Sequence, residues 1–375
     1  MQRVLLFAVN RSQERYFRKV AAAADHISVL HDSRLPLFFF PRRLSNQQSE
    51  LLRKIVDLRL YTDDQECSGY RQGYWKRIFA GVKYYLSTYV FIQRALAYFS
   101  VQPYPLIGLW SGRKWRQLIV AELFSDTRKF IYFENGAMPG TSTVDTAGVN
   151  YTSSIPRDPS FYLGLTLEEA VLPSRLTERK AKKAIKSSAS DELPDEFIFI
   201  PFQVDSDTQI VEYSPWIHNM SQLYEVIVKL KNTLGDKIPP IVVKEHPSSK
   251  NDYRALHQLD PDVVFRNSAN TQELIEKSKF VITVNSSVGF EAVLLNKPVV
   301  TLGNAFFNIE GLVTSVQDAQ SLEIACQNVS KPQEPLRSKF LDYLQREYYV
   351  PGDWRHADEK HVVAVVNRIT KALGA

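Results

Sequence analysis

Cysteine is scarce in this sequence, with only Cys67 and Cys326 in a chain of 375 residues. Two cysteines so far apart exclude a disulfide-stapled scaffold and the clustered thiolates of a structural zinc site, and they favour a reducing compartment. The apolar run before Asn10 is too short for a signal peptide. No apolar stretch approaches the ~18–20 residues that a membrane-spanning helix needs. We therefore expect a cytoplasmic protein that does not cross a membrane.

Glycine and proline, at 15 and 19 residues, are too few for a collagen-like or low-complexity chain. Neither sign of charge dominates, because 46 basic residues against 41 acidic ones leave a net charge of +5. That balance suits anionic ligands or an anionic membrane surface, and it is too weak to indicate nucleic-acid binding. With 44% hydrophobic residues the composition is that of a globular protein, and the length favours two domains.

Short apolar runs alternate with helical patterns in both halves of the chain. The first half predicts strands at Val4–Val9, Leu106–Leu109 and Lys129–Phe133, a shorter one at Pro36–Phe40, and a helical region over residues 46–99 broken near 63–69. The second half is more regular, with predicted strands at Phe197–Pro201, Ile241–Lys244, Val263–Phe265, Phe280–Thr283 and Val299–Thr301. This alternation predicts an α/β protein with largely parallel sheets.

The charged, serine-bearing segment Glu178–Glu196 divides the two halves. We expect an N-terminal Rossmann-like domain over residues 1–190, a C-terminal one over 195–345, and a helical segment over 346–375 that packs back on the first domain. Two Rossmann-like domains facing each other across a cleft form the GT-B arrangement. Ligands of such sheets bind beyond the carboxyl ends of the strands, so candidate residues are sought there.

Three predicted strands of the second half are followed by polar side chains. Gln203, Asp205 and Asp207 follow the first of them. The Asp-Ser-Asp pattern resembles a metal-binding Asp-x-Asp, but it is short and common by chance, so we assign no metal. Either aspartate can act as a nucleophile or base, or simply cap the next helix.

Lys244 ends the second of these strands, and His246 and Pro247 come directly after it. An imidazole there can contact phosphate or carboxylate, although a single histidine is more often incidental. The third strand leads into a helix predicted over Gly289–Leu295. The start of this helix suits an anion, because backbone N–H groups, the helix dipole and hydroxyls converge there. An ordinary serine cap is the simpler alternative. The residues of this segment are Asn285, Ser286, Ser287, Gly289 and Glu291.

In the first half, Glu134 ends a predicted strand and is followed by Asn135 and Gly136. A carboxylate at this position is a candidate catalytic acid, and a capping or solvated glutamate in a turn is equally consistent with the pattern. The polar segment that includes Gly148 and Asn150 is either a functional loop or a plain surface loop.

Taken together, these motifs resemble the bacterial capsule-polysaccharide-synthesis family. The resemblance extends over residues 131–307 and rests on Glu134-Asn135-Gly136, Gly148-Val149-Asn150, Gln203 with Asp207, His246-Pro247, Ser286-Ser287 and Gly289-Phe290-Glu291-Ala292. It implies a retaining β-Kdo transferase that uses CMP-activated 3-deoxy-D-manno-oct-2-ulosonic acid. His-Pro and Ser-Ser are also similar to the CMP-binding pair of bacterial GT-B sialyltransferases.

The resemblance further implies that Asp207 is the nucleophile and Glu134 the acid/base, with no cofactor and no metal. Retention at a sugar carbon requires two inversions, hence one carboxylate to attack and another group to manage the acceptor proton. The implied acceptor is a glycan or lipid-linked glycan, whose identity the first ~100 residues do not reveal. The remaining alternatives are a CMP-sialic or other nonulosonic acid transferase, a nucleotide-sugar epimerase, and a non-catalytic assembly subunit.

Basic and aromatic residues concentrate in Tyr70–Tyr85 and in Arg113–Arg116. They are compatible with peripheral contact to the anionic inner face of a bacterial membrane. The simpler interpretation, which the sequence favours, is a helix with its aromatic residues facing inward and its charges outward.

Overall fold

The apolar run Val4–Ala8 forms the first strand, β1, and every residue in it is buried. Such a continuous apolar run is typical of a central parallel strand covered on both faces.

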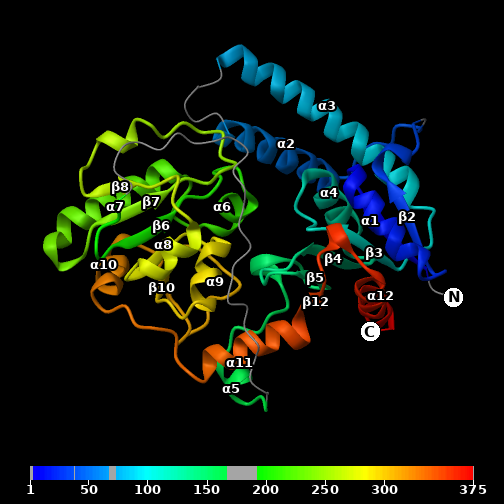
Figure 1. Ribbon diagram of the computed structural model, residues 1–375. Coiled ribbons are helices and arrows are strands. Elements are labelled where there is room, and N and C mark those ends of the chain that lie inside the picture. Colours follow the sequence, from blue (N-terminus) through cyan, green and yellow to red (C-terminus); the bar gives the residue numbers. More distant parts are fainter. Residues whose placement is uncertain (1–2, 38, 67–72, 167–191, 375) are drawn as a thin grey trace. The chain divides into compact units, whose positions relative to one another are not determined.

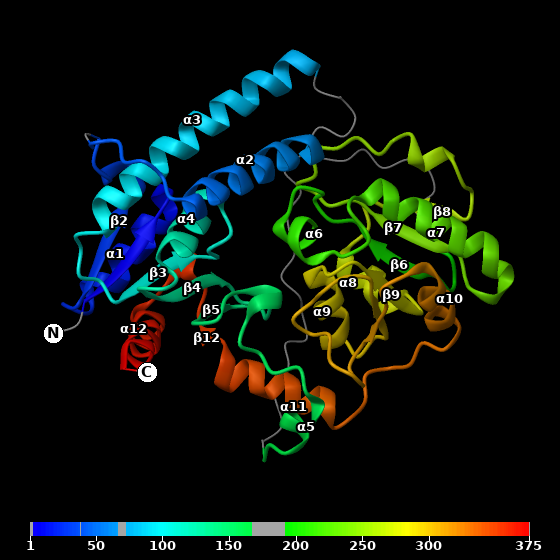
Figure 2. The same cartoon turned by 180° about the vertical axis from the view of Figure 1, so that it is seen from behind.

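The computed structural model describes residues 3–37, 39–66, 73–166 and 192–374. The chain folds into two compact units (Figures 1 and 2). Unit 1 takes in residues 1–61, 72–154 and 348–375, and unit 2 takes in residues 62–71 and 155–347.

The sheet of unit 1 has the strand order β12-β5-β4-β3-β1-β2. Strands β2, β1, β3 and β4 run parallel, whereas β5 pairs antiparallel with β4 and β12 pairs antiparallel with β5. The strands are β1, β2 (Ile27–His31), β3 (Leu106–Trp110), β4 (Lys129–Asn135), β5 (Thr141–Asp145) and β12 (Val350–Pro351). The helices with most of their residues in this unit are α1 (Arg11–Ala22), α2 (Asn46–Glu66), α3 (Tyr74–Phe99), α4 (Trp115–Phe124) and α12 (Glu359–Gly374).

The sheet of unit 2 has the order β11-β10-β9-β6-β7-β8, and its neighbouring strands run parallel to one another. Its strands are β6 (Ile198–Pro201), β7 (Ile241–Lys244), β8 (Val263–Phe265), β9 (Phe280–Thr283), β10 (Val299–Thr301) and β11 (Thr314–Ser315). Its helices are α5 (Pro159–Leu163), α6 (Thr208–Tyr213), α7 (Met220–Leu234), α8 (Thr271–Lys277), α9 (Ser287–Leu294), α10 (Ala319–Gln327) and α11 (Leu336–Tyr343).

Helix α7 illustrates how the sequence determines these elements. The Asn219 side chain accepts a hydrogen bond from the Gln222 N–H and caps the start of the helix. Gly235, whose φ of 53° is positive and favours glycine, ends it. Between these caps, buried side chains recur at helical spacing, Leu223, Ile227, Leu230 and Leu234, and they join the core of unit 2.

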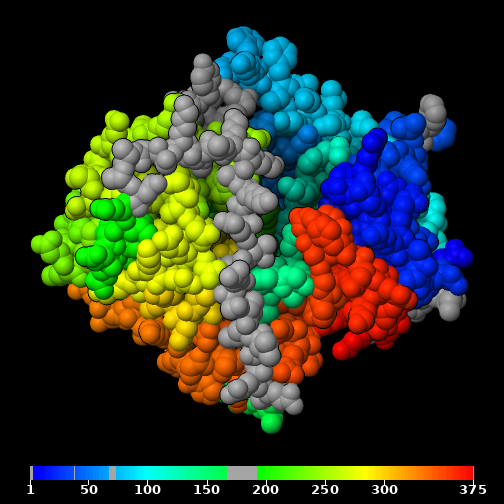
Figure 3. All heavy atoms as spheres, viewed as in Figure 1, coloured from blue at the N-terminus to red at the C-terminus, as the bar shows by residue number. Residues whose placement is uncertain are grey.

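The α/β class and the Rossmann-like character of both halves are confirmed. The C-terminal helix also packs as expected: in Figure 3 α12 (red) lies against α1 (blue), and the His361 Nε2 is 2.9 Å from the Tyr16 hydroxyl. The predicted strand at Pro36–Phe40 is wrong for residues 36, 37, 39 and 40, and Phe38 lies outside the described residues. Its prolines remove backbone donors that a strand needs.

Two element boundaries also differ from the prediction. Strand β4 continues two residues past Phe133, because Glu134 and Asn135 pair with β5, which the sequence did not predict. Helix α9 begins at Ser287 and not at Gly289. The expected domain boundary falls largely on residues 167–191, which lie outside the described residues.

In the part of the chain that the structure describes, no helix combines the length and the apolar character needed to cross a bilayer.

Candidate functional site

The strand order of unit 2 reverses between β6 and β9, since β7 and β8 extend to one side and β10 and β11 to the other. In open parallel sheets, ligands bind outside the carboxyl ends of the strands at this switch point. Most of the candidate residues of unit 2 lie in the segments that follow β6, β7 and β9, at this edge of the sheet.

A pair of buried amides joins the two strands at the switch point. The Gln203 Nε2 donates to the Asn285 Oδ1 at 3.0 Å, and the Asn285 N–H donates to the Gln203 Oε1 at 3.2 Å. The Asn285 Nδ2 also donates to the Gln209 carbonyl at 2.7 Å. Because both amides are buried and satisfied, they hold the loops after β6 and β9 in a fixed relation.

Ser286 caps the start of α9, where its Oγ accepts a hydrogen bond from the Val288 N–H at 3.2 Å. The capping interpretation of this serine is therefore correct, and its hydroxyl retains a donor hydrogen that an anion can accept. Gly289 permits close packing of α9 on the sheet. A Cβ at this position would lie 2.8 Å from the Thr283 Cγ2 and 3.0 Å from the Phe307 ring. Ser287 and Glu291 are partly exposed on the same helix.

The two aspartates after β6 have different environments. The buried Asp205 accepts hydrogen bonds from the Met220 N–H at 2.7 Å, the Asn251 Nδ2 at 2.6 Å and the Tyr253 hydroxyl at 2.8 Å. Burial raises the pKa of Asp205 above its ordinary value. Asp207 is exposed at the start of α6, and its carboxylate accepts the Gln209 N–H at 3.0 Å. Of the two aspartates, Asp207 is thus the one that is accessible from solvent.

The candidate residues at the end of β7 and directly after it are oriented by local contacts. The Lys244 Nζ donates to the Ala269 carbonyl at 2.5 Å and to the Thr271 hydroxyl at 3.0 Å. These hydrogen bonds stabilise the loop that leads into α8. The partly buried His246 accepts the Ser248 N–H at its Nδ1, at 3.1 Å. In the neutral ring the proton then resides on Nε2, which makes that nitrogen a donor. Pro247 follows it directly.

In unit 1 the residues Glu134 and Asn135 end β4. The Glu134 Oε1 accepts hydrogen bonds from the Asn135 N–H at 2.9 Å and Nδ2 at 2.8 Å. The Asn135 Oδ1 in turn accepts the Trp354 Nε1 and the Arg355 guanidinium, each at 2.8 Å. Only glycine fits at position 136, because a Cβ there would overlap the Thr141 side chain.

The loop after β5 is organised by Asp145, which no sequence motif indicated. Its buried carboxylate accepts the Ala147 N–H at 2.7 Å, the Ser154 N–H at 2.8 Å and the Tyr348 hydroxyl at 2.7 Å. These contacts hold the loop that carries Gly148 and Asn150. Tyr348 is 203 residues away in sequence, so no local pattern could have identified this network.

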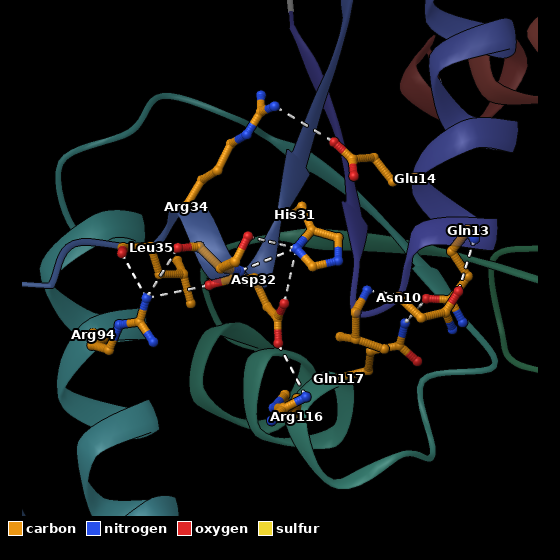
Figure 4. A network of polar contacts seen from close by, with 12 residues as sticks. Asn10, Gln13, Glu14, His31, Asp32, Arg34, Leu35, Arg94, Arg116 and Gln117 are labelled. Atoms are coloured by element: carbon orange, nitrogen blue, oxygen red, sulfur yellow. Dashed lines mark hydrogen bonds and ion pairs between the residues drawn. The ribbon is translucent and has the colours of Figure 1, made fainter.

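A second polar network that the sequence motifs did not indicate lies after β1 and β2 (Figure 4). The Asn10 side chain accepts the Gln13 N–H at 2.9 Å, and the Gln13 Oε1 accepts the Val9 N–H at 3.1 Å. Next to it, the Arg116 guanidinium lies 3.1 Å from the Asp32 carboxylate. An Asn followed three residues later by Gln is a helix-start signature, which could have predicted the first pair from sequence.

Two of the comparisons with known proteins give capsule polysaccharide proteins. Residues 172–354 match the model of the family described as capsule polysaccharide biosynthesis protein. The chain is 35% identical over 251 residues to Protein FixF of Sinorhizobium fredii, a match that covers 66% of this chain and 61% of that protein. It is 24% identical over 277 residues to the capsule polysaccharide export protein KpsS of Escherichia coli, covering 58% of this chain and 70% of that protein.

Among solved structures, one of the most similar is Thermosulfurimonas dismutans KpsC, beta Kdo 2,7 transferase. The TM-score is 0.44 at 14% sequence identity, and the alignment covers 92% of this chain and 100% of that chain. The match to FixF spans less than two thirds of the length of that relative. The family match confirms the resemblance that the motifs indicated, and it takes in the candidate residues of unit 2 but not Glu134.

Proposed function

We propose, from the match of residues 172–354 to the capsule polysaccharide biosynthesis family, that this protein is a retaining β-Kdo glycosyltransferase of bacterial surface-polysaccharide synthesis. Its donor is CMP-β-Kdo and its acceptor is a glycan or glycolipid. The observation that supports the proposal is that β6 and β9, the two strands at the switch point of unit 2, are followed by an accessible carboxylate, Asp207, at the start of α6 and by the serine-capped start of α9.

Binding of the CMP-Kdo donor is argued from the charge of its phosphate. The CMP phosphate carries negative charge, which the start of α9 stabilises through its backbone N–H groups and the hydroxyls of Ser286 and Ser287. The His246 imidazole, which follows β7, supplies a further hydrogen-bonding group for the phosphate. A single phosphate needs no divalent ion to bridge two phosphoryl groups, so we expect full activity in excess EDTA.

Two displacements then give retention. In the first, the Asp207 carboxylate attacks the anomeric carbon of Kdo, the bond from that carbon to the CMP oxygen breaks, and CMP leaves with the electron pair. In the second, Glu134 removes the proton of an acceptor hydroxyl, whose oxygen attacks the same carbon and releases Asp207. Each step inverts the configuration, so the β-linkage is retained.

The test is transfer from CMP-Kdo generated in situ, because this donor hydrolyses readily. Asp207→Asn preserves the helix cap, since asparagine caps as well as aspartate, but it removes the nucleophile. We expect transfer to fall by at least ~10³-fold while CMP binding and thermal stability are unchanged. Asp158→Asn is the matched control, because Asp158 also caps a helix of unit 2, α5.

Wild-type transfer by Asp207→Asn would refute the nucleophile assignment, and an inverted product in the NMR spectrum would refute double displacement. A thermal-shift panel of CMP, UDP, GDP and ADP tests the donor class separately, and stabilisation by UDP alone would favour an epimerase. Glu134→Gln keeps the side-chain oxygen that accepts hydrogen bonds from Asn135. A loss of transfer in this variant would therefore show that the carboxylate is needed to remove the acceptor proton, and not that the local fold has changed.

A further inference from the structure

Helix α3 has an exposed apolar stripe, formed by Trp75, Phe79, Val82, Leu86 and Val90. Their spacing of three and four residues places them on one side of the helix. The exposed fractions are 69% for Trp75, 71% for Phe79 and 57% for Leu86, so these are not partly covered core residues. Tyr74 and Tyr85 are also exposed along the same helix. The stripe extends over about 22 Å of helix.

The stripe is not the face by which α3 joins its own unit. On another side of the helix, Tyr84 lies under the guanidinium of Arg59 from α2, at 4.0 Å, and Thr88 and Phe91 are buried. Figures 1 and 2 show α2 running alongside α3. The favoured sequence interpretation, with aromatic residues facing inward, is therefore wrong for Tyr74, Trp75 and Tyr85. Residues 70–72 of that segment lie outside the described residues.

A neighbouring loop extends this surface. The Gln93 amide of α3 accepts the Arg42 N–H at 3.0 Å and donates to the Arg42 carbonyl at 2.7 Å, which fixes the loop against the helix. Gln93 lies seven residues after Leu86, about two turns further along the same side. Phe40 in this loop is 95% exposed, and Leu37 is exposed as well.

The charge of this surface is of one sign. Residues 36–45 and 74–99 contain no aspartate or glutamate, and their basic residues are Arg42, Arg43, Lys76, Arg77, Lys83 and Arg94. Lys76 and Lys83 are exposed beside the stripe, and Arg42 and Arg43 are exposed in the loop. Exposed aromatic and aliphatic side chains flanked by lysine and arginine match the chemistry of a bilayer interface with anionic headgroups.

We propose that the α3 stripe and the loop of residues 39–43 dock this protein on an anionic phospholipid surface. The apolar side chains enter the headgroup and upper acyl region, and the basic side chains contact lipid phosphates. A second copy of this chain would fit the α3 stripe less well than a membrane, because a two-fold interface would bring the same positive charges together. The proposal concerns a surface apart from the candidate donor residues and does not depend on the transfer reaction.

The test is flotation of the full-length protein with phosphatidylcholine vesicles, with and without added phosphatidylglycerol, and without donor or acceptor. We expect phosphatidylglycerol to raise the bound fraction at low salt and added salt to lower it. Trp75→Ser/Phe79→Ser and Lys76→Glu/Lys83→Glu should each weaken binding by at least ~10-fold, since several apolar contacts or lipid-facing charges are lost.

Two control pairs match these variants in chemistry. Leu259→Ser/Ile324→Ser removes exposed aliphatic side chains of unit 2, and Lys360→Glu/Lys371→Glu makes the same charge change on α12. Both should bind vesicles as the wild type does. No binding to the anionic vesicles, binding indifferent to phosphatidylglycerol, or equal losses in the controls would overturn the proposal. Self-association that Trp75→Ser/Phe79→Ser abolishes, measured by sedimentation, would assign the surface to a second copy.

Discussion

At the scale of single residues, Asp205 and Asp207 are separated by one serine and have opposite roles. Asp205 satisfies three buried donors, whereas Asp207 is exposed and caps α6. We expect Asp205→Ala to lower the free energy of unfolding by about 2–4 kcal/mol, because it takes the acceptor from the Met220 N–H and the Tyr253 hydroxyl, whereas the Asn251 Nδ2 still donates to the Gln65 carbonyl. Urea unfolding measures this change. A loss below about 0.5 kcal/mol would show that these contacts contribute little.

Because the pKa of Asp205 is raised in the folded protein, the sign of its effect on the pH dependence of stability can be stated. The folded protein binds this proton more tightly than the unfolded chain, so its contribution to stability is greatest below the ordinary pKa of 3.8 and declines as pH rises from there through the folded pKa. Asp205→Asn lacks this titration. We therefore expect the stability of the variant relative to wild type to increase between about pH 4 and pH 7. Unfolding curves that keep a constant difference across this range would contradict the assignment.

At the scale of elements, α9 is held close to its sheet because Gly289 has no side chain. Gly289→Ala places a Cβ 2.8 Å from Thr283 and should destabilise the protein by about 1–3 kcal/mol. Gly81→Ala in α3 is the matched control, since the nearest atom there is the Leu60 Cδ1 at 4.0 Å. It should stabilise by about 0.5–1 kcal/mol through helix propensity. Equal effects of the two variants in thermal unfolding would be inconsistent with this account.

At the scale of the whole molecule, the two units have separate apolar cores. One core of unit 1 includes Val365 and Ile369 of α12 packed with Phe17 and Val20 of α1, and the core of unit 2 surrounds its own sheet. Val365→Asp buries a charge in the first core and should cost about 3 kcal/mol or more. We expect hydrogen exchange to rise in unit 1 and remain slow in unit 2.

Val363→Asp, on the exposed side of α12, is the control and should leave exchange unchanged in both units. Faster exchange in both units of Val365→Asp would mean that the two cores unfold together.

The sequence determined the elements whose signals are local. Apolar runs specified β6 to β10, helix periodicity and an Asn-Gly cap pair specified α7, and strand-end motifs indicated the family. Tertiary structure alone decided which polar residues are buried. Nothing near Asp205 or Asp145 in sequence distinguishes them from the exposed Asp207, because Tyr253 and Tyr348 bind them from 48 and 203 residues away. It also decided that the apolar stripe of α3 faces outward while Phe91 on another side is buried, since periodicity shows which side chains share a side of a helix but not what that side packs against.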